Sequence, residues 1–193
     1  MILSTINLFR KYILCVHCKM YLRKGKEFFM KISKVLIALT CLFGLSTISY
    51  AGDTTKSLEA LKAKLNKQGP VKVEGTDSVS GKSVPALFFG KVKVNNNFDV
   101  VDDVKKSFGG TATVFVKDGE EYIRVSTNVL KDDGTRAIGT PLAKNKAYES
   151  IQKGEKFCGE VEILGAPFDT CYEPIKSAEG KILGIYYVGF KKI

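Results

Sequence analysis

One short segment of the sequence carries polar and charged side chains in a pattern that could bind an anion. Residues 122–128 read YIRVSTN, a β-branched and aromatic run that predicts a strand. Because side chains alternate across a strand, the polar ones are expected to share one face: Tyr122, Arg124, Ser126 and Asn128. A guanidinium with hydroxyl and amide neighbours suits a small carboxylate, because its paired donors match carboxylate geometry. The alternative is that this face meets solvent.

A second arginine, Arg136, follows in the glycine-flanked segment DGTRAIGT.

The chemistry open to residues 52–193 is limited by the residue types that they lack, since they contain no His, Met or Trp. His is the commonest general base and a very common metal ligand, so catalytic triads and His-based zinc sites are excluded there. No paired Asp/Glu site of the hydrolase type is recognisable. We therefore expect no enzyme activity, no metal site and no cofactor.

The two cysteines of residues 52–193 predict the register of a hairpin. In FCGEVEILGAPFDTC, an antiparallel pairing of Cys158 with Cys171 places the turn at Leu164-Gly165, where glycine already favours one. The same register makes one face apolar, with Phe157, Val161, Ile163, Phe168 and Tyr172. The other face is acidic, with Glu160, Glu162, Asp169 and Glu173. A half-buried hairpin requires this division, so we predict a Cys158–Cys171 disulfide; two reduced thiols are the alternative.

The elements that must position these residues follow from apolar spacing and turn signals. Helices are predicted at 54–70, where Leu58, Leu61 and Leu65 form one stripe, and at 98–110 and 141–154, the last with Pro141 in its first turn. Loops are predicted at 71–83 and 129–140. Strands are predicted at 85–96, 110–116 and 121–128, with three more in 157–175 and 181–190. This order predicts an α+β fold with a mainly antiparallel sheet.

The N-terminal part has the composition of an export signal. Residues 30–51 start with Met30 and two lysines, continue with an uncharged apolar run at 35–48, and end in Ser-Tyr-Ala. We expect a cleaved signal peptide there and a periplasmic or secreted location; the alternative is an inner-membrane anchor formed by residues 35–48. Residues 1–29 are expected to be a mis-assigned upstream extension.

The charge distribution argues against nucleic-acid binding. Of the net charge of +10, most belongs to residues 1–51, which carry eight Lys or Arg against Glu27 alone. Residues 52–193 carry 22 Lys or Arg against 19 Asp or Glu. A nucleic-acid groove usually needs a basic stripe on the folded body, so no nucleic-acid partner is expected.

The second half of the chain resembles a known family of sensor domains. The segments RVSTN, DGTRAIGT, YEPI and GIYYVG occur in the order and spacing of the periplasmic Cache domains of chemoreceptors, of the single-Cache type called the Cache 3/Cache 2 fusion. The resemblance covers residues 85–193, with 52–84 as an N-terminal helix and loop. It implies a PAS-like fold with a central sheet of five to six strands, a long N-terminal helix behind it, and a loop-helix layer over a ligand pocket.

The resemblance also implies which residues line the pocket. Arg124, Ser126 and Tyr122 are the candidates on the central strand, and Tyr172 is the candidate on the hairpin. Tyr148 and Phe115 are further candidates, although side chains of this kind are more often plain core. Arg136 is expected either to close the pocket or to cap its turn.

The expected function is therefore ligand binding without turnover. We expect a sensor-type domain for a small organic acid, without its own signalling module, because the chain stops just after its last strand. A membrane receptor, kinase or transporter is the expected protein partner. The alternative is an envelope interaction module, or a membrane-anchored sensory accessory protein, that binds no small ligand.

Overall fold

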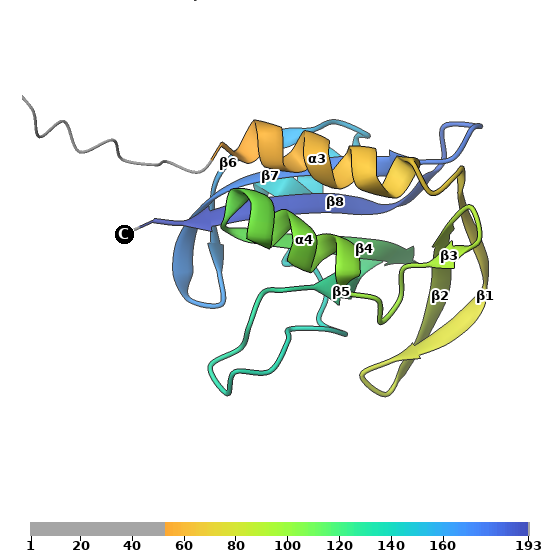
Figure 1. The fold of residues 1–193 in the computed structure, drawn as a ribbon, viewed down its shortest axis with the longest axis horizontal. Helices are drawn as coiled ribbons and strands as arrows, with labels where there is room; N and C mark the ends of the chain where they lie inside the picture. Colours follow the sequence, from red (N-terminus) through yellow and green to blue (C-terminus); the bar gives the residue numbers. More distant parts are fainter. Residues whose placement is uncertain (1–52, 193) are drawn as a thin grey trace, which may run out of the picture. The chain divides into compact units, whose positions relative to one another are not determined.

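The computed structural model describes residues 53–192, and the predicted signal peptide and upstream extension lie outside the described residues. The larger sheet contains β4 (Thr111–Asp118), β5 (Glu121–Thr127), β6 (Phe157–Ile163), β7 (Ala166–Lys176) and β8 (Ile182–Lys191). Its strands are antiparallel neighbours in the order β5-β4-β8-β7-β6. A smaller sheet contains β1 (Val71–Val79), β2 (Lys82–Phe89) and β3 (Val92–Lys93). The predicted α+β class with an antiparallel sheet is confirmed (Figure 1).

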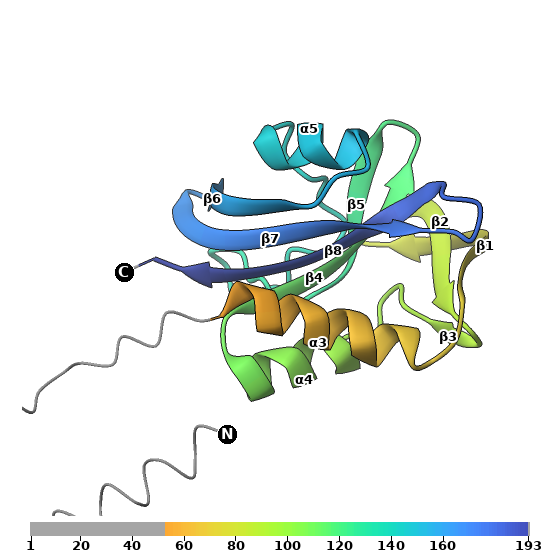
Figure 2. The same cartoon turned by 90° about the horizontal axis from the view of Figure 1, so that it is seen from above.

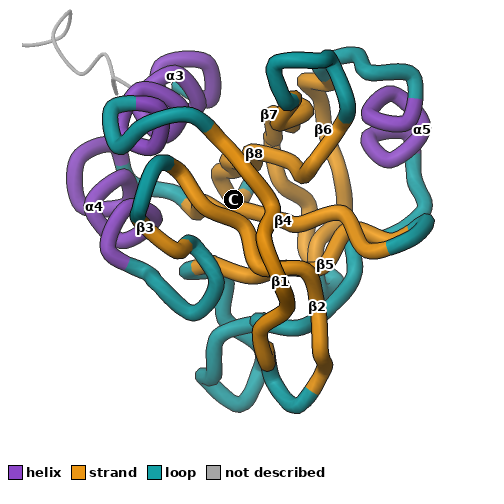
Figure 3. Tube along the Cα trace, turned by 90° about the vertical axis from the view of Figure 1, so that its right-hand side faces the viewer, coloured by secondary structure: helices purple, strands orange, loops and turns teal. Residues whose placement is uncertain are grey.

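Three helices cover the two faces of the larger sheet. Helices α3 (Thr54–Asn66) and α4 (Asp99–Phe108) lie on one face, and α5 (Lys146–Gln152) lies over the other (Figures 2 and 3). Each face has its own apolar cluster: one includes Leu58, Val101 and Val114, and the other includes Phe115, Tyr172 and Tyr187. The larger sheet therefore separates one core, beneath α3 and α4, from a second core, beneath α5 and its neighbouring loops.

Helix α3 forms as its sequence predicts. The Asp53 side chain accepts a hydrogen bond from the Lys56 amide at 3.0 Å and caps the N-terminus. The expected stripe of Leu58, Leu61 and Leu65 is buried. At the other end, the Tyr186 hydroxyl of β8 donates to Asn66 Oδ1 at 3.0 Å. The helix is thus fixed against the sheet by an apolar stripe and by a polar contact at its last residue.

The prediction of a loop at residues 71–83 is wrong. Residues 71–79 form β1, which pairs with β2 through a turn at Ser80-Gly81, where both residues have positive φ. Most of β1 is exposed, so its alternation lacks the apolar contrast that marks a half-buried strand. Strand β1 therefore forms because it pairs with β2, and the composition of residues 71–79 alone does not indicate this pairing.

The helix predicted at 141–154 starts too early. Leu142 donates its backbone N–H to the Tyr122 carbonyl at 2.8 Å, which holds this part of the chain along β5. The helix begins only at Lys146, after Asn145 accepts bonds from the amides of Ala147 and Tyr148. Pro141 is a plausible first helical residue by type, but tertiary pairing to β5 overrides that preference.

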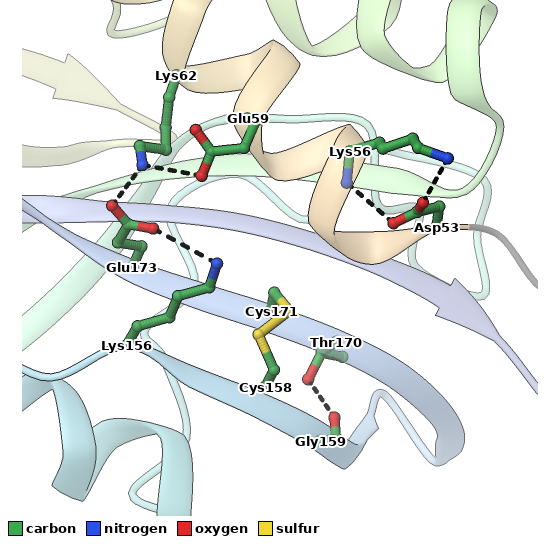
Figure 4. The surroundings of a disulfide bond; sticks show 10 residues. All are labelled: Asp53, Lys56, Glu59, Lys62, Lys156, Cys158, Gly159, Thr170, Cys171 and Glu173. Atoms are coloured by element: carbon green, nitrogen blue, oxygen red, sulfur yellow. Dashed lines mark hydrogen bonds and ion pairs between the residues drawn. A yellow bond between two sulfur atoms is a disulfide. The ribbon is translucent and has the colours of Figure 1, made fainter. Parts of the chain in front are cut away.

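The predicted hairpin register is confirmed. Cys158 pairs with Cys171 across β6 and β7, Ile163 pairs with Ala166, and the cysteines form a disulfide (Figure 4). Val161 and Phe168 are buried beneath α5, whereas Glu160, Glu162 and Asp169 are exposed. Glu173 lies on the helix face of β7 and accepts from Lys62 of α3 at 2.6 Å. The acidic face of the hairpin therefore contacts α3 through Glu173, and its apolar face packs into the core beneath α5.

Candidate functional site

Arg124 is a buried cation in the core beneath α5. It lies on β5, is 7% exposed, and its guanidinium carbon lies 5.1 Å from the centre of the Phe115 ring. Nη1 donates to Thr140 Oγ1 at 2.7 Å, and Nε is buried without a hydrogen-bond partner. Phe115 is thus the aromatic support under the guanidinium, and its place in a ligand pocket stays a prediction.

The Arg124 charge has no carboxylate partner in residues 53–192, because none of their ion pairs includes it. Burial lowers the pKa of Arg124, and the hydroxyl groups of Tyr172 and Tyr187 oppose that effect. A guanidinium nevertheless stays protonated in proteins. A buried charge without a counter-ion is costly, so this position is suited to an anion supplied from outside the described chain.

Two tyrosines from neighbouring strands lie beside Arg124. The rings of Tyr172 on β7 and Tyr187 on β8 have centres 4.8 Å apart, and both residues are almost fully buried. Burial raises the pKa of both phenols above the ordinary value, so both remain protonated hydrogen-bond donors at neutral pH. The Tyr187 hydroxyl shares a 3.0 Å hydrogen bond with Thr111 Oγ1.

The segment 137–142 runs along the outer edge of β5 and is hydrogen-bonded to Arg124. The Arg124 amide donates to the Thr140 carbonyl at 3.0 Å, and the Gly139 amide donates to the Arg124 carbonyl at 2.8 Å. Thr140 Oγ1 accepts from Arg124 and donates to the Ala137 carbonyl at 2.7 Å. The segment therefore holds both the backbone and the side chain of Arg124.

Gly139 allows this segment to pass close to the β1–β2 turn. Its φ is +76°, and a Cβ added there would lie 2.7 Å from the Ser80 Cβ. We expect Gly139→Ala to lower the free energy of unfolding by about 2 kcal/mol, through left-handed strain and overpacking together. The measurement is the urea midpoint.

Gly134→Ala is the matched control, because Gly134 also has a positive φ, +78°, but nothing within 4 Å of its Cβ position. It should show the strain alone, about 1 kcal/mol. Equal losses for the two variants would contradict a role for the close approach of Gly139 to Ser80.

The prediction that Ser126 shares a face with Arg124 is wrong. The β4–β5 register shifts between Val114, which pairs with Ser126, and Phe115, which pairs with Arg124. Val125 is the extra residue of this bulge, so the alternation breaks there. Ser126 faces α4 instead and donates to the Asn97 carbonyl at 2.5 Å.

Asn128, expected on the same polar face, also lies on the α4 side. Its Oδ1 accepts from the Ala112 amide at 2.7 Å, and its Nδ2 donates to the Val101 carbonyl at 2.6 Å. These contacts join the end of β5 to both β4 and α4, so Asn128 stabilises the fold and does not face Arg124.

Tyr122 of β5 packs against Tyr148 of α5. Their ring centres are 5.9 Å apart in an edge-on arrangement, and the fully buried Tyr122 hydroxyl has no hydrogen-bond partner. Tyr148 is half-buried and donates its hydroxyl proton to the Glu120 carbonyl at 2.7 Å. The structure brings Tyr122 to the same face as Arg124, whereas the Tyr148 hydroxyl is committed to the β4–β5 turn.

Of the two roles left open for Arg136, the contacts favour support of its own loop. Nη1 and Nη2 bind the two carboxylate oxygens of Asp102 on α4 at 2.8 Å each, and Nη1 also donates to the Thr127 carbonyl. The guanidinium carbon lies 4.5 Å from the centre of the Phe98 ring. Arg136 therefore ties the 129–140 loop to α4, on the opposite side of the sheet from Phe115.

The residues predicted from the sequence do not include Tyr187 and Thr140, which lie beside Arg124. They also do not include Thr111, which is hydrogen-bonded to Tyr187. Tyr187 stands in IYYVG, where every residue is apolar or small, so periodicity does not show which tyrosine faces Arg124. Its neighbour Tyr186 faces α3 instead. Thr140 was placed in a loop, and only the pairing of residues 139–142 with β5 brings it to the guanidinium.

Within residues 53–192 no group of three or more His, Cys, Asp or Glu is arranged to hold a metal ion. None of the helices described there has the length and apolar character to cross a bilayer. Comparison with known families finds that the model of the Cache 3/Cache 2 fusion domain matches residues 45–193. No curated protein matches the chain.

Proposed function

The chain belongs to the Cache 3/Cache 2 fusion domain family, and from its buried arginine we propose that it binds one small organic acid beside Arg124. Cache domains are generally extracellular sensors of small molecules, and they bind ligands rather than convert them. What this chain adds is a guanidinium without a carboxylate partner among the described residues, held between aromatic rings. That observation carries the proposal of an anionic ligand.

The ligand carboxylate would complete the hydrogen bonding of the guanidinium. Nε is buried without a partner and Nη1 already donates to Thr140 Oγ1, so the anion would bind along the Nε side. The protonated hydroxyl group of Tyr172 is the candidate additional donor. The Tyr187 hydroxyl instead donates to Thr111 Oγ1, because the Thr111 hydroxyl donates to the Gly189 carbonyl. Phe115 and the tyrosine rings would exclude water, as expected of a site with few polar anchors in an apolar wall. Ser126 is left out because it faces α4.

Access to the site would require a local movement. Arg124 is 7% exposed, and the segment 137–142 is hydrogen-bonded to its backbone and to its guanidinium. We propose that this segment opens to admit the acid and closes again through Thr140. We also keep the proposal of an exported protein with a membrane receptor, kinase or transporter as its partner, which is supported by the signal-like residues 30–51.

A thermal-shift screen tests the proposal directly. Acetate, propionate, pyruvate and lactate are compared with neutral propionamide. An acid present at about 100 times its Kd should stabilise the protein by about 2.7 kcal/mol, which raises Tm by roughly 8 °C for a domain of this size. Propionamide should give no shift. If none of the acids raises Tm, the proposal is wrong.

A further inference from the structure

A groove of about 390 Å³ lies where the small sheet meets two turns of the larger sheet, and Arg124 is not among the residues that line it. Its walls come from β1 and β2, from the β4–β5 turn, and from the start of β8. In Figure 1 these elements gather at the end of the domain away from the arrowhead of β8. The lining of the groove does not include Arg124 or its contacts Phe115 and Thr140, so the groove is distinct from the Arg124 site by the residues that form it.

The lining combines apolar walls with two cations. The apolar part consists of Val73, Pro85, Ile182 and Leu183, and the polar part consists of Lys117, Lys181 and the backbone at Gly119. Val73 is 38% exposed although it is a large apolar residue. The β1–β2 register shifts directly after Val73, and Pro85 brings no amide donor. The groove is therefore a product of the local irregularity of the small sheet.

The charges in the lining are of one sign. Neither lysine takes part in an ion pair within residues 53–192. Acids occur in the adjoining turns at Asp118, Glu120 and Glu179, but they do not line the groove. An occupant with an apolar body and a negative end would bury the exposed walls and pair with the lysines.

We propose that this groove binds a small amphiphilic anion, namely an aliphatic or aromatic carboxylate larger than the acid bound at Arg124. Its volume is in the range of small-molecule sites, and its seven lining residues are too few for a stable protein interface, which needs about 20 residues on each side. The apolar body contacts Val73, Pro85 and Leu183, while the carboxylate lies between Lys117 and Lys181. A short acid such as acetate lacks the body that would fill the groove.

The test is an NMR titration of uniformly ¹⁵N-labelled protein with hexanoate and with neutral hexanamide. We expect saturable shifts of the Lys117, Gly119 and Leu183 amides with hexanoate, and binding at least threefold weaker with hexanamide. The double variant Lys117→Gln/Lys181→Gln should raise the Kd for hexanoate about five- to tenfold, because each exposed ion pair contributes up to about fivefold. Lys105→Gln, on the exposed surface of α4, is the control and should leave the Kd unchanged.

Three results would overturn the proposal. The first is no shift of the groove amides up to about 10 mM hexanoate, a range that detects millimolar affinity. The second is a groove shift whose Kd is the same in the double lysine variant, because anion recognition would then be wrong. The third is a shift confined to Arg124, Gly139 and Thr140, which would place hexanoate at the arginine site alone. Retained dispersion of the remaining amides verifies that the variants are folded.

Discussion

Replacing Arg124 by methionine is expected to reduce the acid-induced rise in Tm to at most about a third and to leave the ligand-free protein at least as stable as before. Truncating one member of a buried charge pair costs about 2–5 kcal/mol of binding, or at least roughly a 30-fold rise in Kd. Without ligand, the same guanidinium is a desolvated charge with an unpartnered Nε. Methionine keeps an apolar stem against Phe115, so we expect a gain of about 1 kcal/mol and a rise in Tm of roughly 3 °C.

Arg136→Met is the matched control for this experiment. Arg136 pairs with Asp102 and binds the Thr127 carbonyl, so its loss should lower stability by roughly 1–2 kcal/mol. The acid-induced shift in Tm should survive in this variant. An acid-induced rise in Tm as large in Arg124→Met as in the unaltered protein would contradict the proposed site. A loss of ligand-free stability as large as that of Arg136→Met would show that Arg124 is a structural residue.

Removing the disulfide should produce the largest loss of stability. The Cys158→Ala/Cys171→Ala variant opens the loop between two cysteines that are 13 positions apart. In the chain-entropy model this change lowers the free energy of unfolding by roughly 3 kcal/mol. For a domain of this size, Tm should fall by roughly 10 °C. Tyr172 directly follows Cys171 on β7, so the affinity for acids is expected to fall as well.

Reduction of the unaltered protein is the control for the double variant. A reducing agent should produce a comparable fall in Tm in the original protein and no further fall in the variant. Mass spectrometry of the unreduced protein should show a deficit of two hydrogens. A Tm in the double variant equal to that of the oxidised protein would contradict a stabilising role, and two free thiols would contradict the bond.

The hairpin of residues 157–172 shows what sequence patterns can predict. Three independent features agree on one register: the cysteine pair, the turn at Leu164-Gly165, and the division into apolar and acidic faces. Helix α3 is similar, because its cap and its leucine stripe are both local features. Such elements can be predicted because the interactions that specify them join residues close together in the chain.

The arginine strand shows where this reasoning stops. The identity of residues 122–128 predicts a strand, but the bulge at Val125 arises from the pairing of β5 with β4, and it turns Ser126 to the other face. The β1 strand was missed for the same reason, since an exposed strand acquires its partner only from the neighbouring hairpin arm. In both cases a backbone hydrogen-bond register overrides the side-chain pattern.

The chain's local patterns are sufficient for the α+β class, the disulfide and the presence of two arginines near one strand. They do not distinguish the two arginines, which occur twelve positions apart in similar polar surroundings. Folding gives Arg136 the carboxylate of Asp102, from a helix 34 residues earlier. It leaves Arg124 among Phe115, Tyr172 and Tyr187, without a carboxylate partner within residues 53–192. The physical reason is that burial and charge pairing depend on which distant side chains the packed sheet brings together.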